Sequence, residues 1–317
     1  MRYYEITLTP KGSTTPIRTW SSYPGGVYDP GALDVEFDMP VTTYGAPAGG
    51  QTISVHGISL SDLTQSQQFA GMNMIFKAGM KAGLPLVTPS QAGTIIAGDI
   101  FQSFGNWQGT DMTLDFVLNP AIYTNDTPGN FTLVWNKGER LSDSLTHCLQ
   151  VALPNMPISM NISPSLVLSN DGHHYCKTLD QLAQYIDDLT DRKFKGNRVN
   201  ISIQGGKLVI FDNTYTPNPI QINFNDFIGQ PTWVDVQTLQ IKTVMRADLQ
   251  LGARITMPTG FQNAPGFVAT SPASYPSSLK YKSTFSGNFT IIELRHIGSY
   301  RSSDASNWCT LFNCVPI

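Results

Sequence analysis

The stretch Leu33-Asp34-Val35-Glu36-Phe37-Asp38-Met39 alternates apolar and acidic residues without interruption. Successive side chains on a β-strand point to opposite faces, so this stretch predicts a strand with an apolar face and a carboxylate face. The pattern is typical of an antiparallel sheet that buries one face and exposes the other. Pro40 follows directly. Because proline cannot donate to a strand ladder, we expect it to end the strand or to lie at a sheet edge.

Further strand-like segments occur towards both ends of the chain. Alternating or apolar-rich runs lie at residues 52–56, 72–77, 94–104, 113–119, 249–257, 289–297 and 308–315. Glycine and proline punctuate these runs, as in Gly105-Asn106-Trp107-Gln108-Gly109. Short strands with such punctuation predict a barrel or a sandwich. A loop rich in Pro, Gly and Ser covers residues 258–280.

The middle of the chain has a different character. Apolar residues at helical spacing predict a helix over residues 141–152, which Pro154 ends. Thr178 stands at capping-box spacing from Gln181 and begins a second helix with one apolar stripe. Residues 157–168 are expected to be extended, and two strands flank Gly205-Gly206 in a hairpin that needs positive φ.

These segments predict a mainly β protein with an α+β insertion. We expect a β-barrel-like domain at residues 1–137, a small α/β domain at residues 138–230, and a second β region at residues 231–317. The last region forms either a second barrel-like domain or strands that complete the first one.

The composition favours uncharged polar surfaces. Apolar residues make up 41% of the chain and charged residues 14%, well below the roughly 25% charged residues of typical soluble globular proteins. A poorly charged surface suits packing between subunits because burying a charge at an interface costs free energy. An ordinary β-protein with a polar surface has the same composition, so both interpretations stay open.

Charge and hydropathy disfavour two classes of function. The net charge is -3, and no basic patch with interleaved aromatic residues is present, which argues against sequence-specific nucleic-acid binding. No run approaches the roughly 20 apolar residues that cross a bilayer. The start Met1-Arg2-Tyr3-Tyr4-Glu5 lacks the apolar core of a signal peptide. We therefore expect a cytoplasmic product without membrane insertion.

Motifs that carry chemistry are scarce. The sequence holds no phosphate-binding, dinucleotide-binding, serine-hydrolase or zinc-protease signature. His173-His174-x-Cys176 has plausible metal-ligand types, but adjacent residues rarely serve one tetrahedral site, and a polar loop is the simpler interpretation. The 4 cysteines are too few and scattered for a disulfide framework and are expected to be free thiols. We expect a non-catalytic protein with no metal and no cofactor.

The carboxylates Asp34, Glu36 and Asp38 have two interpretations. They form a row on one strand face, about 7 Å apart at strand spacing. Paired carboxylates can perform acid–base chemistry, whereas a row on an alternating strand is more often a solvated face. His296 ends an apolar strand and is expected to be a structural histidine.

Three stretches together resemble a known family. The first is residues 76–86 followed by 98–110, the second is residues 141–149 with Ala152-Leu153-Pro154, and the third runs from His296 to Thr310. Their order resembles the baseplate hub proteins of contractile-tailed bacteriophages, of the late-control type. The loop at residues 258–280 has no counterpart in the resemblance. The family-like residues are Gly105, Asn106, Trp107, Gly109, His296, Gly298, Arg301, Trp308 and Thr310.

The resemblance implies a homotrimer built from two similar β-barrel-like domains per subunit. The resulting ring would join the tail tube to the central spike in the virion, after assembly in the host cytoplasm. DNA would pass through the ring without specific binding. Because a lumen that passes DNA should repel phosphate, Asp34, Glu36 and Asp38 become candidate lumen-facing acids.

Other functions stay open beside the hub. A tube initiator or a distal tail protein is another β-ring tail component, and such rings are expected to be hexamers. A hydrolase acting on cell wall or surface polysaccharide would need two carboxylates about 5–10 Å apart in a cleft. A carbohydrate-binding module would present a row of exposed aromatic side chains.

Overall fold

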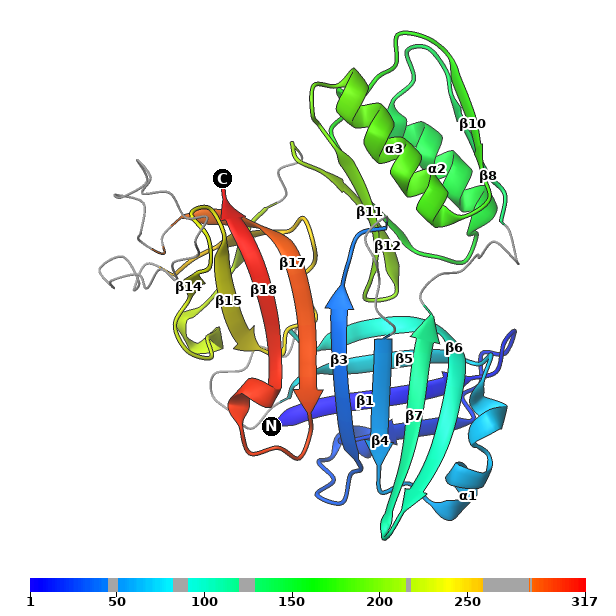
Figure 1. Ribbon diagram of the computed structural model, residues 1–317, viewed down its shortest axis with the longest axis vertical. Coiled ribbons are helices and arrows are strands. Elements are labelled where there is room, and N and C mark those ends of the chain that lie inside the picture. Colours follow the sequence, from blue (N-terminus) through cyan, green and yellow to red (C-terminus); the bar gives the residue numbers. More distant parts are fainter. Residues whose placement is uncertain (45–50, 82–90, 120–128, 215–217, 259–284, 286) are drawn as a thin grey trace. The chain divides into compact units, whose positions relative to one another are not determined.

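The computed structural model describes residues 1–44, 51–81, 91–119, 129–214, 218–258, 285 and 287–317 (Figure 1). The chain divides into two compact units. Unit 1 comprises Met1–Val41, Gly50–Asn119 and Asn218–Ile317, and unit 2 comprises Thr42–Gly49 and Pro120–Pro217. None of the helices in the described ranges is long and apolar enough to cross a membrane.

Unit 1 is built on one large sheet. Its strands are β1 (Arg2–Thr9), β2 (Arg18–Ser21), β3 (Asp34–Val41), β4 (Gln51–His56), β5 (Asn73–Met80), β6 (Gly93–Gln108), β7 (Asp111–Asn119), β13 (Ile220–Gln221), β14 (Thr232–Trp233), β15 (Leu239–Val244), β16 (Arg254–Thr256), β17 (Asn288–Ser299) and β18 (Trp308–Pro316). Their main order is β14-β15-β18-β17-β3-β4-β7-β6-β5-β1-β2. A short helix α1 (Leu60–Thr64) lies between β4 and β5 in the chain. The two ends of the sequence therefore share one sheet through the β17–β3 pair.

The alternating stretch at residues 33–39 forms most of β3. Val35, Phe37 and Met39 are buried, while Glu36 and Asp38 are exposed. The apolar side chains join a core that also contains Tyr4, Phe76 and other residues of β1, β4, β5, β6 and β7. Pro40 lies inside β3, opposite Arg295 of β17, at a point where pairing with β4 has already ended. Its missing N–H therefore costs no ladder bond on the β4 side.

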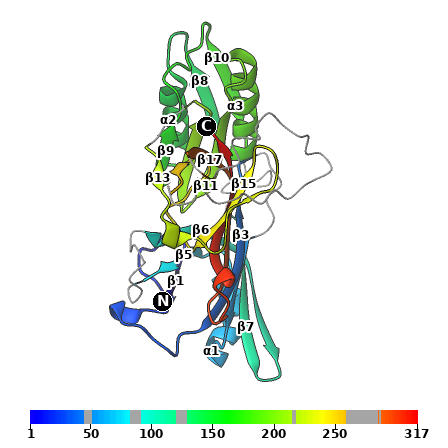
Figure 2. The ribbon, with the colours of Figure 1, turned by 90° about the vertical axis from the view of Figure 1, so that its left-hand side faces the viewer.

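Unit 2 combines two helices with two small sheets. Its elements are β8 (Phe131–Trp135), α2 (Leu141–Ala152), β9 (Ile158–Asn161), β10 (Gly172–Cys176), α3 (Leu179–Lys193), β11 (Val199–Gln204) and β12 (Lys207–Asp212). One sheet pairs β8 with β10, and the other has the order β11-β12-β9. Figures 1 and 2 show α2 and α3 beside these strands, and α2 contacts β8 and β9 while α3 contacts β10 and β11. The buried apolar faces meet in a separate core.

The helices and the hairpin of unit 2 agree with the sequence prediction. The predicted start of the second helix is confirmed, because the Thr178 hydroxyl accepts a hydrogen bond from the Gln181 N–H at 3.2 Å. Gly205 and Gly206 both have positive φ, as the β11–β12 turn requires. Of the extended stretch at residues 157–168, a strand forms at Ile158–Asn161.

One predicted strand is largely wrong. Residues 249–257 alternate along their length, but a strand forms only at Arg254–Thr256. Gly252 has a φ of 76°, which turns the backbone out of the extended region before that point. Leu249 and Leu251 are nevertheless buried, so the alternating apolar residues reflect core packing without a strand.

Domain boundaries predicted from the sequence and compact units in the structure do not coincide. The sequence predicts a middle domain at residues 138–230, whereas unit 2 holds residues 120–217 and the segment at 42–49. Tyr44 of that segment donates its N–H to the carbonyl of Ile201 at 2.8 Å. The division into three domains stays a prediction. The loop at residues 258–280 lies outside the described residues apart from Pro258.

Candidate assembly surface

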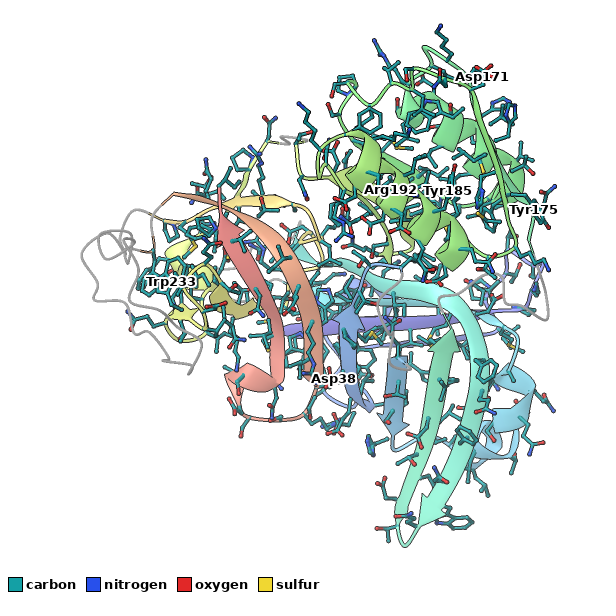
Figure 3. All side chains as sticks on the ribbon, turned by 45° about the horizontal axis from the view of Figure 1, so that its top comes forward. Asp38, Asp171, Tyr175, Tyr185, Arg192 and Trp233 are labelled. Atoms are coloured by element: carbon teal, nitrogen blue, oxygen red, sulfur yellow. The ribbon has the colours of Figure 1, made fainter. Side chains whose placement is uncertain are left out.

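The acidic side chains of β3 share the outer face of the sheet with neighbouring strands. Residues directly opposite in an antiparallel pair point to the same face. Asp34, Glu36 and Asp38 stand opposite His56, Ser54 and Thr52 of β4. On the other side, Glu36 and Asp38 stand opposite Ser299 and Ile297 of β17. Figure 3 labels Asp38 at the junction of β3 and β17.

Each of these three carboxylates has a partner within unit 1. The Arg295 guanidinium donates to both Asp38 oxygens, with Nε 2.6 Å from Oδ1. The Ser299 hydroxyl donates to Glu36 Oε1 at 3.0 Å. The Arg301 N–H donates to Asp34 Oδ1 at 3.0 Å. The carboxylates are therefore held in place, mainly by neutral donors.

Sequence reasoning missed further carboxylates on the same face. Asp115 accepts hydrogen bonds from the Ser54 hydroxyl at 2.6 Å and from the Asn106 amide at 2.8 Å. Asp111 lies 3.4 Å from His56 Nδ1. These carboxylates join the face because β7 pairs with β4. The sequence alone does not show which strands pair, so it could not predict this grouping.

The outer face carries an excess of negative charge. This face runs over β15, β18, β17, β3, β4, β7 and the adjoining end of β6. Its carboxylates in the described residues are Asp34, Glu36, Asp38, Asp111, Asp115 and Glu293, and its Lys and Arg residues are Lys242 and Arg295. Such a face repels polyanions at moderate ionic strength.

Four family-like residues of the closing segment, His296, Gly298, Trp308 and Thr310, are buried. The Trp308 indole N–H donates to the Gly79 carbonyl at 2.9 Å, and its ring lies 5.3 Å from that of Phe37. Gly298 stands opposite Phe37 on the inner face. A Cβ atom built on Gly298 would lie 2.1 Å from Phe37 Cε1, so this glycine makes room for the ring.

His296 and Thr310 belong to a buried polar cluster. His296 Nδ1 lies 3.0 Å from the Thr310 hydroxyl, and this hydroxyl also accepts the Arg246 N–H at 2.9 Å. Burial lowers the pKa of His296 to about 4. The histidine is therefore neutral near pH 7, and its structural role stays a prediction.

Arg246 carries the most deeply buried ion pair of this cluster. Its Nη1 lies 2.9 Å from Asp226 Oδ2, and both side chains are almost fully buried. Its Nε and Nη2 donate to the two Asp248 oxygens at 3.0 and 2.6 Å. The Gln91 amide donates to Asp226 at 3.2 Å. This cluster joins residues far apart in the sequence, so no local motif could have predicted it.

Four other family-like residues lie at or near the β6–β7 turn. Asn106, Trp107 and Gly109 are exposed, and the Trp107 indole N–H donates to the Gly109 carbonyl at 2.9 Å. Trp107 is 62% exposed, which is unusual for so large an apolar side chain. Gly105 faces α1, and a Cβ there would lie 2.9 Å from the Leu63 carbonyl oxygen. Arg301 lies on the β17–β18 turn and donates to the carbonyls of Pro30 and Ala32.

The histidine–cysteine motif is split by its strand. His173 stands opposite Val134 and His174 opposite Leu133, so the two imidazoles point to opposite faces of β10. His174 stacks on Tyr185 with ring centroids 3.7 Å apart, and Cys176 is buried. In the described part of the chain, no group of His, Cys, Asp and Glu side chains has metal-binding geometry. Cys148, Cys176, Cys309 and Cys314 are free and buried.

The mainly β architecture with its α/β unit is similar to the folds of solved tail proteins. The chain matches a tail protein of Neisseria meningitidis with 10% identity and a TM-score of 0.50, over 99% of this chain and 96% of that one. It matches the 43 kDa tail protein of prophage MuSo2 from Shewanella oneidensis with 8% identity and a TM-score of 0.50, over 100% and 98%. The resemblance to phage tail proteins predicted from the motifs is therefore confirmed for the fold.

A third match comes from a secretion system. A PdpA–VgrG complex of Francisella contains a chain with 7% identity and a TM-score of 0.50, of which this chain covers 58%. No protein-family model matches the sequence, and no curated protein matches it.

Proposed function

We propose that this chain is a structural baseplate hub subunit of a contractile phage tail, which forms a ring between the tail tube and the central spike. The observation that carries the proposal is the extent of the fold. Two tail proteins, one of them from a prophage, match over 99% and 100% of this chain, and over 96% and 98% of their own length. A non-catalytic role agrees with this likeness, and no cofactor is required by it.

The acidic outer face suits the lining of a ring that passes DNA. Asp34 and Glu36 are fixed by neutral hydrogen-bond donors of β17 and of the turn that follows it. Among the described residues, no Lys or Arg forms a salt bridge with Asp34 or Glu36, in contrast to Asp38 with Arg295, although His56 Nε2 lies 3.8 Å from Glu36 Oε2. A lining with net negative charge repels phosphate and lets DNA pass without specific binding.

The exposed end of β6 supports assembly through neighbouring copies. β5 pairs with β6 as far as Asp99, and among the described strands only β7 pairs with residues 102–108. Of residues 101–108, only Ser103 is buried. Leu63 and Ser66 cover this edge at Gly105 and Ser103, so the uncovered part is the end at residues 106–108. An uncovered strand edge invites pairing with another chain, and a closed ring removes this hazard. We propose a homotrimer with tube, baseplate and spike proteins as further partners.

The three-domain division belongs to the same proposal. The sheet path falls into strands from residues 1–119 and strands from residues 218–317, which meet at the β17–β3 pair. Two barrel-like halves of this kind, at residues 1–137 and 231–317 in the sequence division, would give a trimer six-fold-like symmetry. The unit between them, at residues 138–230 in that division, would decorate the ring. The proposed location is the virion, after assembly in the host cytoplasm.

Native mass measurement with images of the particles tests the proposal. We expect trimeric rings whose axis is lined by Asp34, Glu36 and Asp38. A hexameric ring would instead favour a tube initiator or a distal tail protein. A monomer at assembly concentrations, or rings with these acids pointing away from the axis, would contradict the hub. Hydrolysis of peptidoglycan or polysaccharide by the pure protein would overturn its non-catalytic part.

A further inference from the structure

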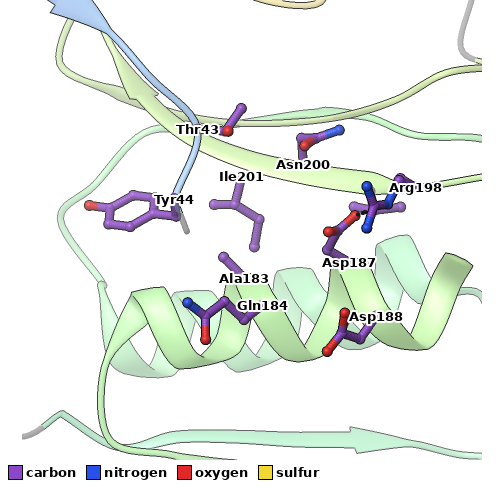
Figure 4. Close-up of a pocket in the computed structure, with 10 residues that line it drawn as sticks. Thr43, Tyr44, Ala183, Gln184, Asp187, Asp188, Arg198, Asn200 and Ile201 are labelled. Atoms are coloured by element: carbon purple, nitrogen blue, oxygen red, sulfur yellow. Dashed lines mark ion pairs between the residues drawn. The ribbon is translucent and has the colours of Figure 1, made fainter. Parts of the chain in front are cut away.

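Unit 2 contains a pocket that the hub function does not use. Helix α3, strand β11 and the segment at Thr43 and Tyr44 form its walls (Figure 4). Its volume is about 430 Å³, which lies within the range of small-ligand sites. The polar lining residues are Thr43, Tyr44, Gln184, Asp187, Asp188, Arg198 and Asn200.

Buried hydrogen bonds hold the walls of this pocket in place. Thr190 of α3 accepts the Val199 N–H at 3.1 Å and donates to the Ile186 carbonyl at 2.8 Å. The third wall is fixed because the Ser202 hydroxyl donates to the Thr42 carbonyl at 2.7 Å. The pocket is therefore preformed, which lowers the conformational entropy cost of binding.

The lining has more negative than positive charge. Arg198 Nε lies 3.1 Å from Asp187 Oδ1 and 4.0 Å from Asp191 Oδ1. Burial raises the pKa of Asp187, as do the charges of Asp188 and Asp191, and Arg198 offsets part of this. In the described residues no salt bridge reaches the Asp188 carboxylate. Carboxylates that outnumber the cations beside them favour an incoming positive charge.

The shape of the polar lining selects among cations. Asp187, Asp188 and Gln184 of α3 and Asn200 of β11 all line the pocket (Figure 4). A guanidinium carries five N–H donors in a planar fork and can reach several such acceptors at once. An ammonium is a compact point charge that would leave much of the volume to water.

We propose that this pocket binds the guanidinium group of an arginine side chain presented by a partner protein. The proposal gives unit 2 a docking task of its own, independent of ring formation. Asp188 forms the main ion pair with the arginine, Gln184 closes the outer side as an exposed residue of α3, and Asn200 accepts from β11. Arg198 stays ion-paired with Asp187 when the ligand binds. Asp188 is then the one lining carboxylate available to an incoming cation.

Ligand-observed saturation-transfer NMR on the full chain tests the proposal with N-acetyl-L-arginine amide as the probe. The neutral isostere N-acetyl-L-citrulline amide has the same shape without the charge. We expect binding of the arginine probe to weaken at least about fivefold in Asp188→Asn, at low ionic strength. Gln184→Trp should block the pocket sterically, and Asp143→Asn on α2 should bind as the native chain does.

Two results would overturn the proposal. One is equal binding of the citrulline and arginine probes, and the other is unchanged arginine binding in both Asp188→Asn and Gln184→Trp. Both substitutions are at exposed positions of α3, so the fold should survive them. Ring formation is measured separately, so either proposal can fail while the other stands.

Discussion

The closing segment from His296 to Thr310 and the β6–β7 turn both carry family-like residues, but their environments are opposite. His296, Trp308 and Thr310 are buried and hydrogen-bonded to the interior of unit 1. Trp107 at the other site is 62% exposed. A resemblance based on motifs therefore combines two constraints, one from core packing and one from a surface that remains available for contact. The burial of each residue in the structure shows which of the two constraints applies to it, whereas the sequence motif alone does not.

The largest effect should come from Gly298→Ala in the closing segment. The new Cβ would lie 2.1 Å from Phe37, whose ring is confined between those of Phe76 and Trp308 at 4.8 and 5.3 Å. Overpacking of a rigid core costs typically 1–3 kcal/mol and occasionally more, and we expect about 3 kcal/mol or more here. Denaturant unfolding followed by tryptophan fluorescence measures the loss.

Gly109→Ala at the exposed turn is the matched control. Gly109 has a φ of 62°, and nothing lies within 4 Å of the added Cβ. The cost is then the backbone strain of a non-glycine residue, about 1 kcal/mol. Equal losses in the two glycine variants would show that burial does not separate the two motifs.

The pH dependence of stability should expose the buried histidine. His296 has a folded-state pKa of about 4, below its ordinary value of 6.5, because burial disfavours the charged form. The unfolded chain therefore binds a proton between these values while the native chain does not. The free energy of unfolding is therefore not reduced by His296 above pH 6.5. As the pH drops from 6.5 towards 4, proton uptake by the unfolded chain lowers this free energy by about 3 kcal/mol.

Denaturant unfolding at several pH values between 4 and 7.5 measures this slope. His296→Gln keeps a polar side chain opposite Thr310 and removes the titrating group. The difference between the native chain and the variant isolates the histidine from the carboxylates that titrate nearby. A variant with the same pH slope as the native chain would exclude His296 as its source.

The positions of individual strands could be predicted from the sequence more accurately than the assignment of segments to compact units. The period-two pattern of residues 33–39 led to β3 because alternation and burial coincide there. The same reasoning failed at residues 249–257, because the positive φ of Gly252 interrupts an alternation that the core still requires. The segment at Tyr44 joins unit 2 through a hydrogen bond to Ile201, a contact about 160 positions apart that no local pattern encodes.

The candidate surface could be predicted only in part for the same reason. The carboxylates of β3 were visible as a row in one strand. Asp111 and Asp115 belong to the same face only through the register of β7 with β4. The ion pair of Arg246 with Asp226 joins residues that are distant in the sequence. Strand register and long-range pairing depend on the tertiary fold, so a single sequence does not specify them.

A smaller effect is expected from Arg295→Gln, one residue before His296 on the opposite face of β17. Arg295 and Asp38 form an ion pair whose side chains are about half exposed, so water screens it. We expect a loss of up to about 1 kcal/mol in unfolding free energy, which shrinks further in high salt. Unfolding at low and high salt measures it. A loss as large as that of Gly298→Ala would contradict the prediction, because substitutions on the exposed and buried faces of β17 would then cost the same unfolding free energy.

The smallest effect on stability, and the sharpest test of the exposed motif, should come from Trp107→Ala combined with Phe104→Ala. Both side chains are exposed, at 62% and 47%, so their removal should change the unfolding free energy by less than about 0.5 kcal/mol. If the β6–β7 turn contacts a neighbouring copy, the same variant should lose oligomer in native mass measurements, because exposed aromatic residues anchor interfaces. Lys11→Ala, at an exposed ion pair with Asp99 of β6, is a control that should leave assembly intact. Assembly that survives the double substitution would show that these exposed residues do not contribute to contacts between subunits. The two family-like sites would then differ only in how tightly their side chains are packed.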